Sequence, residues 1–303
     1  MKKQLKTSAC FPDSDKRVRI LGVGIDPISP KQLRHIFRQF LKDRQQHFLA
    51  TVNPEFIIEA QINKNFREIL SFCDLNVADG IGILWASRYL NLRIDDSWVR
   101  SRAKKLYFRK FLALWQAFYS LLAIVFYPRF LKTRIPRRIT GTDVANTLVK
   151  LTQSGNHTVY LLGGQKGATT AAKLALEKKY PKALIVGSRT GFLKKGQTEK
   201  SFRKSVNKAK PDILLVALGS PRQEYWIFKN MDKMPSVKIA VGIGGALDFL
   251  AKTKKRAPAF MQKTGLEWLF RLYQEPWRLP RIKKATFIFI KKVVKYKLKE
   301  SGL

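Results

Sequence analysis

Short β-branched runs that alternate with segments of helical periodicity constrain the fold of this chain more than any other feature of its sequence. Most of the runs are followed by apolar residues at three- and four-residue spacing, which is typical of a helix packed on one face. Such an alternation predicts an α/β fold, a mostly parallel sheet with helices on both faces. The expected strands are 18–25, 47–52, 75–78, 158–163, 183–188, 212–219 and 237–244.

Several of these runs end in glycine and a polar residue. The stretch ADGIG places Asp79 directly after the run 75–78 and before Gly80. Ligands of open α/β sheets bind at the carboxyl ends of the strands, so these ends together predict one shared cleft. The alternative role for Asp79 is to cap the helix that begins near Ile81. Two further expected strands end in glycine and polar residues. They are VALGSPRQEYW, with Gly219, Gln223 and Glu224, and VGIGGALDF, with Gly244, Gly245 and Asp248.

The stretch LLGGQKGATT carries Gly163, Gly164 and Gly167 between an expected strand and an expected helix. Free backbone N–H groups at such a turn can hold a pyrophosphate, although a tight strand-to-helix turn needs the same glycines. The complete GxGxxG pattern is missing, and so is an acidic residue at the distance that ribose binding needs. Both absences argue against an NAD-dependent enzyme.

The charge of the chain points to a polyanionic partner. Its 59 Lys and Arg outnumber its 21 Asp and Glu and give a formal net charge of +38. Nucleic acid, an anionic lipid surface and a phosphorylated substrate all fit such a balance. Cys10 and Cys73 are too few for a disulfide framework or a zinc site, and the three histidines have no ligand spacing. The basic N-terminus lacks the apolar segment of a secretory signal, so we expect a cytoplasmic core.

Residues 94–136 interrupt the pattern with a basic and apolar insert. Its run from Phe111 to Tyr127 is apolar or aromatic except for Gln116 and Ser120, which is short for a membrane span. Aromatic residues and flanking basic residues favour contact with an anionic bilayer surface. We expect re-entrant or interfacial insertion in preference to a full crossing. The alternative is a helical hairpin buried in the core.

The C-terminal third is the second interruption. From residue 252 onward it is rich in Trp, Phe, Arg and Lys, and it ends in KKATFIFIKKVVKYKLK. A basic, aromatic helix of this kind can lie on a membrane or bind nucleic acid. We therefore divide the chain into a tail (1–17), an α/β core (18–251) that contains the insert, and a helical appendage (252–303).

Seven sequence blocks carry a family resemblance. In order, they are TVNPEF, ADGIG, RITGTDV, VALGSPRQEYW, GIGGALDF, KRAP and GLEWLFRLYQEPWRLPR. Apart from the insert, residues 18–285 closely resemble the WecG/TagA/CpsF family of bacterial glycosyltransferases. The resemblance implies a Rossmann-like core and an inverting, metal-independent transfer without a cofactor. An N-acetylmannosamine-type sugar would pass from a UDP donor to a polyprenyl-diphosphate-linked N-acetylglucosamine at the cytoplasmic membrane face, for cell-wall or surface-polysaccharide synthesis.

The resemblance also implies roles for single residues. Asp79 falls on the family's proposed general base, which would accept the proton of the attacking sugar hydroxyl. Arginines suit the departing diphosphate because they offer paired donors and never deprotonate. No DxD pair lies near the expected pocket, in keeping with an arginine-based site. The further matching positions are Thr51 and Asn53 beside the base, Arg138 and Gln223 in the pocket, Asp248 against the uridine, and Arg271, Arg278 and Arg281 in the appendage.

The insert departs from the family pattern, in which a short connection joins the helix after the ADGIG block to the RITGTDV block. We expect the insert to enlarge the membrane-docking face. The expected partners are a UDP-activated amino sugar, a lipid-diphosphate-linked acceptor and an anionic membrane surface, with the protein peripheral or monotopic. A nucleic-acid-binding protein is the alternative that the charge supports, but it does not explain the apolar insert. The sequence leaves homo-oligomer formation open.

Overall fold

The computed structural model describes residues 17–300 except 96, 98, 100, 166, 192–198, 254 and 255. Its centre is a six-stranded sheet in the order β4-β3-β8-β7-β5-β6, in which all neighbours are parallel. The α/β, Rossmann-like fold predicted from the sequence is confirmed. The strands are β3 (His47–Val52), β4 (Leu75–Ala78), β5 (Thr158–Gly163), β6 (Leu184–Arg189), β7 (Ile213–Ala217) and β8 (Ile239–Gly242).

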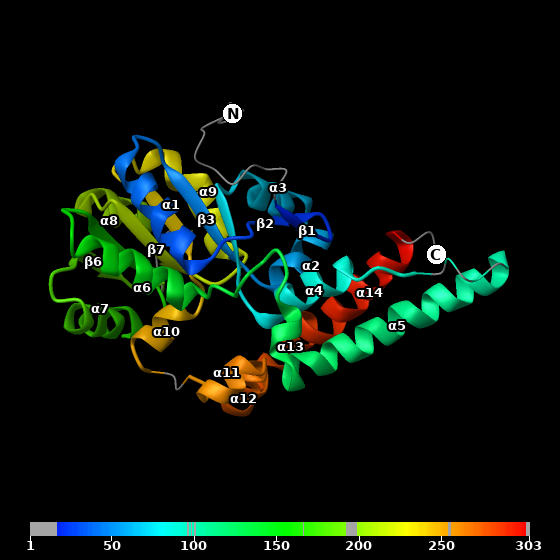
Figure 1. Cartoon of the computed structure of the whole chain (residues 1–303). Helices are drawn as coiled ribbons and strands as arrows, with labels where there is room; N and C mark the ends of the chain where they lie inside the picture. The colour runs from blue at the N-terminus through cyan, green and yellow to red at the C-terminus, as the bar shows by residue number, and fades with distance from the viewer. Residues whose placement is uncertain are drawn as a thin grey trace.

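Helices cover both faces of this sheet, as Figure 1 shows. Successive residues of a strand point to opposite faces, so Ile213 and Leu215 join one hydrophobic core while Leu214 and Val216 join the other. The first face is covered by α1 (Pro30–Lys42), α6 (Gly141–Thr152), α7 (Ala168–Lys179) and α10 (Ala246–Leu250). The second is covered by α2 (Pro54–Ile62), α3 (Lys64–Phe72), α4 (Ile81–Asn91), α8 (Lys200–Ala209), α9 (Arg222–Asn230) and α14 (Phe289–Glu300).

The run 18–25 is not the single strand that the sequence predicted. It folds into an antiparallel pair, β1 (Val18–Ile20) and β2 (Val23–Ile25), outside the main sheet. Leu21 and Gly22 form the turn, and both have a positive φ, 48° and 81°. Two consecutive positive φ values match the twist of a two-residue hairpin turn. A leucine in this conformation gives no sequence signal, which is why the turn was missed.

The insert contains one long helix, α5 (Arg102–Phe126), followed by the short 3₁₀ helix η2 (Pro128–Leu131). Figure 1 shows α5 extending away from the sheet. Its inner face packs against α4 and α14 through small or polar residues, among them the buried Ala113, Ala117 and Ser120. The indole N–H of Trp85 donates to the Ser120 hydroxyl at 2.9 Å. The predicted apolar helical insert is therefore confirmed as one continuous helix, and a hairpin with its turn inside residues 111–126 is wrong. The expected interfacial insertion stays a prediction.

The C-terminal segment packs closely against the core. It contains α11 (Ala259–Lys263), α12 (Glu267–Gln274), η4 (Pro276–Arg278), α13 (Leu279–Lys283), the π-turn η5 (Lys284–Ile288) and α14. Phe289 and Val293 of α14 are buried, and the Phe289 ring lies edge-on to Trp85 of α4 with centroids 6.3 Å apart. Lys297 of α14 donates to the Gln116 side chain of α5 at 2.6 Å. Helices α4, α5 and α14 thus form one packed unit. Of the predicted N-terminal tail, residues 1–16, including Cys10, lie outside the described residues.

Candidate active site

A cavity of about 540 Å³ lies at the carboxyl edge of the sheet. One wall consists of the segments that follow β3, β4, β7 and β8, which we call the strand-end wall. The other consists of the ends of α5 and α12 together with η4, α13 and η5, which we call the helical wall. Every site residue predicted from the sequence lines this cavity: Thr51, Asn53, Asp79, Arg138, Gln223, Asp248, Arg271, Arg278 and Arg281.

Asp79 stands where β4 ends, and its backbone N–H donates to the Val52 carbonyl at 2.8 Å. Gly80 follows with a φ of +107° and occupies the N-cap position of α4. The backbone donor that faces the Asp79 carboxylate belongs to Gly141 of α6 and not to α4. The structure therefore gives no support to the alternative in which Asp79 caps α4, and its carboxylate is left to the cavity.

Burial raises the pKa of Asp79 to about 6. Arg271 and Arg138 lower this pKa and Glu267 raises it, but desolvation by burial is the largest effect. A carboxylate with this pKa is mostly ionised at pH 7 and yet binds a proton far more readily than an exposed aspartate. Such a pKa suits a general base that works near neutral pH.

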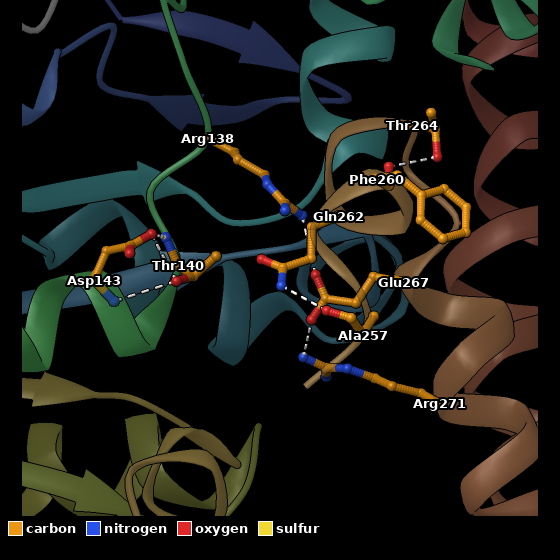
Figure 2. A network of polar contacts seen from close by, with 9 residues as sticks. All are labelled: Arg138, Thr140, Asp143, Ala257, Phe260, Gln262, Thr264, Glu267 and Arg271. Atoms are coloured by element: carbon orange, nitrogen blue, oxygen red, sulfur yellow. Dashed lines mark hydrogen bonds and ion pairs between the residues drawn. The ribbon is translucent and has the colours of Figure 1, made fainter. Parts of the chain in front are cut away.

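Glu267 joins two of the predicted arginines across the cavity. Its Oε2 accepts from Arg138 Nη1 at 3.2 Å, and its Oε1 accepts from Arg271 Nη2 at 2.8 Å, as Figure 2 shows. Burial raises the pKa of Glu267, but Arg271, Arg138 and Arg256 outweigh it and leave the pKa below its ordinary value. Glu267 therefore stays ionised between Arg138, which precedes α6, and Arg271 of α12.

The other two arginines are also ion-paired with glutamates. Arg278 Nε lies 2.6 Å from Glu275 Oε2. Arg281 of α13 donates from Nε and Nη2 to Glu55 Oε2 of α2 at 2.9 and 2.8 Å. Each predicted diphosphate-binding arginine thus faces a carboxylate.

Sequence reasoning missed these glutamates. Glu267 precedes Arg271 by four residues and Glu275 precedes Arg278 by three, and both spacings place side chains on one helix face. This signal was present in GLEWLFRLYQEPWRLPR. The pairing of Glu55 with Arg281 spans 226 residues, and no local pattern could have shown it.

The residues of the strand-end wall are held by hydrogen bonds to the fold. The Thr51 hydroxyl donates to the Gly242 carbonyl at 3.0 Å, and the Asn53 side chain accepts from the Phe56 N–H at 3.2 Å. Asn53 caps α2, and Pro54 is the first residue of this helix. Gln223 is buried, and its side-chain oxygen accepts from the Gly244 N–H at 3.1 Å. Asp248 lies in α10 and is 8% exposed.

The glycine-rich loop after β5 and the single residue Glu224 lie outside the cavity lining. Gly163, Gly164 and Gly167 are not among the lining residues. Gly163 has a φ of +115° and lies so close to Ala217 of β7 that a side chain would clash, so the tight-turn interpretation fits this loop. Glu224 is fully buried beside Gly242, and burial raises its pKa to about 7.

Within the part of the chain that the structure describes, no three His, Cys, Asp or Glu side chains gather into a metal-binding group. Among the described residues, the charged side chains that line the cavity are Asp79, Asp248, five arginines and their glutamate partners. Guanidinium groups recognise phosphate by paired donors, so the helical wall can stabilise a diphosphate. Together with Asp79, the cavity can bind an anionic leaving group and accept a proton.

Comparison with known proteins agrees with this chemistry. The model of the glycosyl transferase WecG/TagA/CpsF family matches residues 18–102 and 122–302. The gap, residues 103–121, covers most of α5. The N-acetylglucosaminyldiphosphoundecaprenol N-acetyl-beta-D-mannosaminyltransferases of Staphylococcus aureus strains MRSA252 and NCTC 8325 are each 26% identical to this chain over 285 residues. These alignments cover 93% of this chain and 94% of each relative.

Proposed function

The chain belongs to the WecG/TagA/CpsF family of glycosyltransferases, and we propose that it transfers an N-acetylmannosamine-type sugar from a UDP donor to polyprenyl-diphosphate-linked N-acetylglucosamine. The names of the Staphylococcus aureus relatives state the same sugar and a lipid-diphosphate acceptor. One observation carries the proposal. The cavity brings Asp79 together with Arg138 and Arg271, a base beside cations that can hold a leaving diphosphate.

In the proposed reaction Asp79 accepts the proton of the acceptor hydroxyl. The hydroxyl oxygen then bonds to the anomeric carbon of the donor sugar, and the bond from that carbon to the β-phosphate oxygen breaks. UDP leaves with the electron pair. A single displacement from the opposite face inverts the anomeric configuration. Arg271, Arg278 and Arg281 stabilise the charge that develops on the diphosphate, so the reaction needs no metal ion.

Membrane association follows from the acceptor and from α5. One side of this helix exposes large apolar side chains, whereas its opposite side packs on α4 and α14. Residues Lys104–Phe126 are long and apolar enough to span a bilayer, which by itself is weak evidence for a span. The exposed stripe and its basic flank support a protein bound to the cytoplasmic membrane face. The stripe contains Tyr107, Phe111, Leu114, Trp115, Phe118 and Leu122.

Incubation of the purified chain with UDP-sugars and a short-chain lipid-diphosphate N-acetylglucosamine acceptor tests the proposal. We expect UDP release and a disaccharide product only with an N-acetylmannosamine-type donor, and an unchanged rate when a chelator is added. Release of UDP that requires a divalent cation would contradict the metal-independent mechanism. If none of the donors transfers a sugar to the acceptor, the proposed function is refuted.

A nucleic-acid-binding function remains the competing explanation of the net charge of +38. It does not account for the cavity or for the exposed apolar stripe of α5. Flotation with anionic vesicles, with and without competing RNA, separates the two functions. We expect flotation that RNA does not reverse, whereas displacement by RNA would favour the nucleic-acid function.

A further inference from the structure

The cavity has a second, apolar end that the transfer reaction does not use. On the helical wall, Leu121, Ile124 and Val125 of α5 line it, and Phe287 and Ile290 line it from η5 and α14. These side chains lie in the same cavity as Asp79 and the arginines. The cavity lining therefore combines charged side chains with an apolar group from α5, η5 and α14.

Large exposed apolar residues accompany this end. They come from five separate elements of the helical wall and its surroundings, which a soluble surface rarely gathers without a partner. The most exposed are Tyr273 at 85%, Phe126 at 80%, Trp277 at 73%, Phe287 at 70% and Phe260 at 63%. Such residues are typical of a surface that meets a bilayer at the level of its headgroups.

Helix α5 closes the apolar end by direct contact with the loop before α12. Gly265 of this loop has a φ of +74°, and a Cβ added there would lie 2.7 Å from Ile124 and 3.0 Å from Ile81. The loop and α5 are thus packed without space for a side chain between them. The family model leaves residues 103–121 of α5 unmatched, whereas Ile124, Val125 and the loop before α12 lie in the part that it matches.

We propose that this apolar end, between α5 and η5, binds the first isoprene units of the acceptor's polyprenyl chain. The inference rests on the proposed function. The acceptor's sugar hydroxyl must reach Asp79, and its hydrocarbon chain needs an apolar surface. Asp79 and the apolar end line this one cavity. The exposed aromatic residues place the outer part of this end against the membrane. The acceptor can then enter without its hydrocarbon chain leaving the bilayer.

Calorimetry on the full-length chain tests the binding site without an enzymatic reaction. The probes are a 15-carbon isoprenyl diphosphate and methyl diphosphate, which carry the same charged group. We expect the isoprenyl probe to bind at least about 100-fold more tightly, or about 2.7 kcal/mol. Burial of three to four CH₂ groups is enough for this difference.

Val125→Trp fills the apolar end and should lower this affinity ratio at least about tenfold. Val125 does not pack against the core cluster, so the substitution leaves the packing of α5 in place. Leu114→Trp is the matched control, because Leu114 lies on the same helix, is 56% exposed and does not line the cavity. In Leu114→Trp, the ratio of the affinities for the two probes should equal that of the wild type. Phe287→Ser, at a residue that is 70% exposed, provides a second variant whose ratio should also fall.

An equal affinity for both probes in the wild type would overturn the inference. The inference would also be overturned if Val125→Trp and Phe287→Ser left the ratio of the two probe affinities unchanged. If Leu114→Trp lowered this ratio as much as Val125→Trp does, the binding would belong to the outer surface of α5. The transfer assay is read separately. If no sugar is transferred and the ratios still behave as expected, the proposed function fails and the isoprenoid site stands.

Discussion

The two walls of the cavity differ in how they hold their functional side chains. Thr51 lies at the end of β3, and Asp79 and Gln223 follow β4 and β7. All three are fixed by hydrogen bonds with backbone groups. The arginines of the helical wall are fixed by glutamates on helices or turns, and Arg281 is half exposed. Ion pairs at such exposure contribute about 0–1 kcal/mol. The strand-end wall is therefore preorganised, whereas the half-exposed Arg281 of the helical wall can exchange its carboxylate partner for another anion at little cost.

The largest effect we expect is a loss of turnover when Asp79, on the strand-end wall, is replaced. Asp79→Asn keeps the size of the side chain but cannot accept a proton, so turnover should fall by about 10²–10⁴-fold. UDP binding should persist, because the arginines are unchanged. Turnover at saturating donor and acceptor, together with calorimetry for UDP, measures both.

Stability provides the control for this variant. Since burial raises the pKa of Asp79 to about 6, the native state favours the protonated form. Its contribution to stability is present in acid and is lost as the pH rises through about 6. At pH 8, Asp79→Asn should therefore unfold at a temperature no lower than that of the wild type. Near-normal turnover in this variant would contradict the role of Asp79 as base.

The second prediction tests whether ion pairs alone hold the helical wall. Phe289 is 1% exposed and packs against Trp85, so Phe289→Ala should lower the free energy of unfolding by about 3–5 kcal/mol. Urea denaturation measures the change. Phe287→Ala, two residues away and 70% exposed, is the matched control and should cost less than about 0.5 kcal/mol. Equal, small losses would mean that α14 is not part of the core, and that its removal with the appendage leaves a folded protein.

The third prediction concerns Glu267, which connects the walls. Glu267→Gln keeps one hydrogen bond but removes the charge between Arg138 and Arg271, and we expect kcat/KM to fall about tenfold, or about 1.4 kcal/mol. The negative charge of Glu267 raises the pKa of Asp79. Without it, the acid limb of the pH–rate profile should move to lower pH, because Asp79 must be ionised to act as base.

Glu199→Gln is the control for this substitution. Glu199 pairs with Arg222 at 2.8 Å, and neither residue lines the cavity. This variant should leave the acid limb in place. An acid limb that moves to higher pH in Glu267→Gln would contradict the expected charge effect and would show that the arginines had moved away from Asp79.

The strand-end wall was largely predictable from the sequence, and the reason is geometric. The carboxyl ends of parallel strands meet at one edge, so motifs such as those around Asp79, Gln223 and Asp248 converge once the strands are identified, whereas Thr51 was indicated only by the family resemblance. The β1–β2 turn was not predictable in this way, because Leu21 adopts a positive φ that leucine rarely shows.

The helical wall depends on contacts between distant segments. The sequence indicated the arginines through the family motif, but the Arg138–Glu267 pair spans 129 residues. The insert was correctly predicted to be helical, but which side of α5 packs on the protein was not predictable, for a related reason. Ala113, Ala117 and Ser120 are small residues with nearly regular helical spacing, but their partners on α4 and α14 are set by tertiary packing. The membrane contact of its outer face remains a prediction.

The smallest effect we expect comes from a single charge beside this outer face. Lys110 is exposed near the middle of α5, and a basic residue close to an anionic bilayer contributes about 1 kcal/mol. Lys110→Gln should therefore weaken binding to anionic vesicles about fivefold, and this difference should shrink at high salt because the charge is screened. On neutral vesicles the variant and the wild type should bind equally, which cosedimentation measures. Lys178→Gln is the matched control, since Lys178 is exposed on α7, at the opposite end of the molecule in Figure 1. Equal losses for both variants would show that binding follows the net charge alone, and that the helical wall has no preferred orientation toward the membrane.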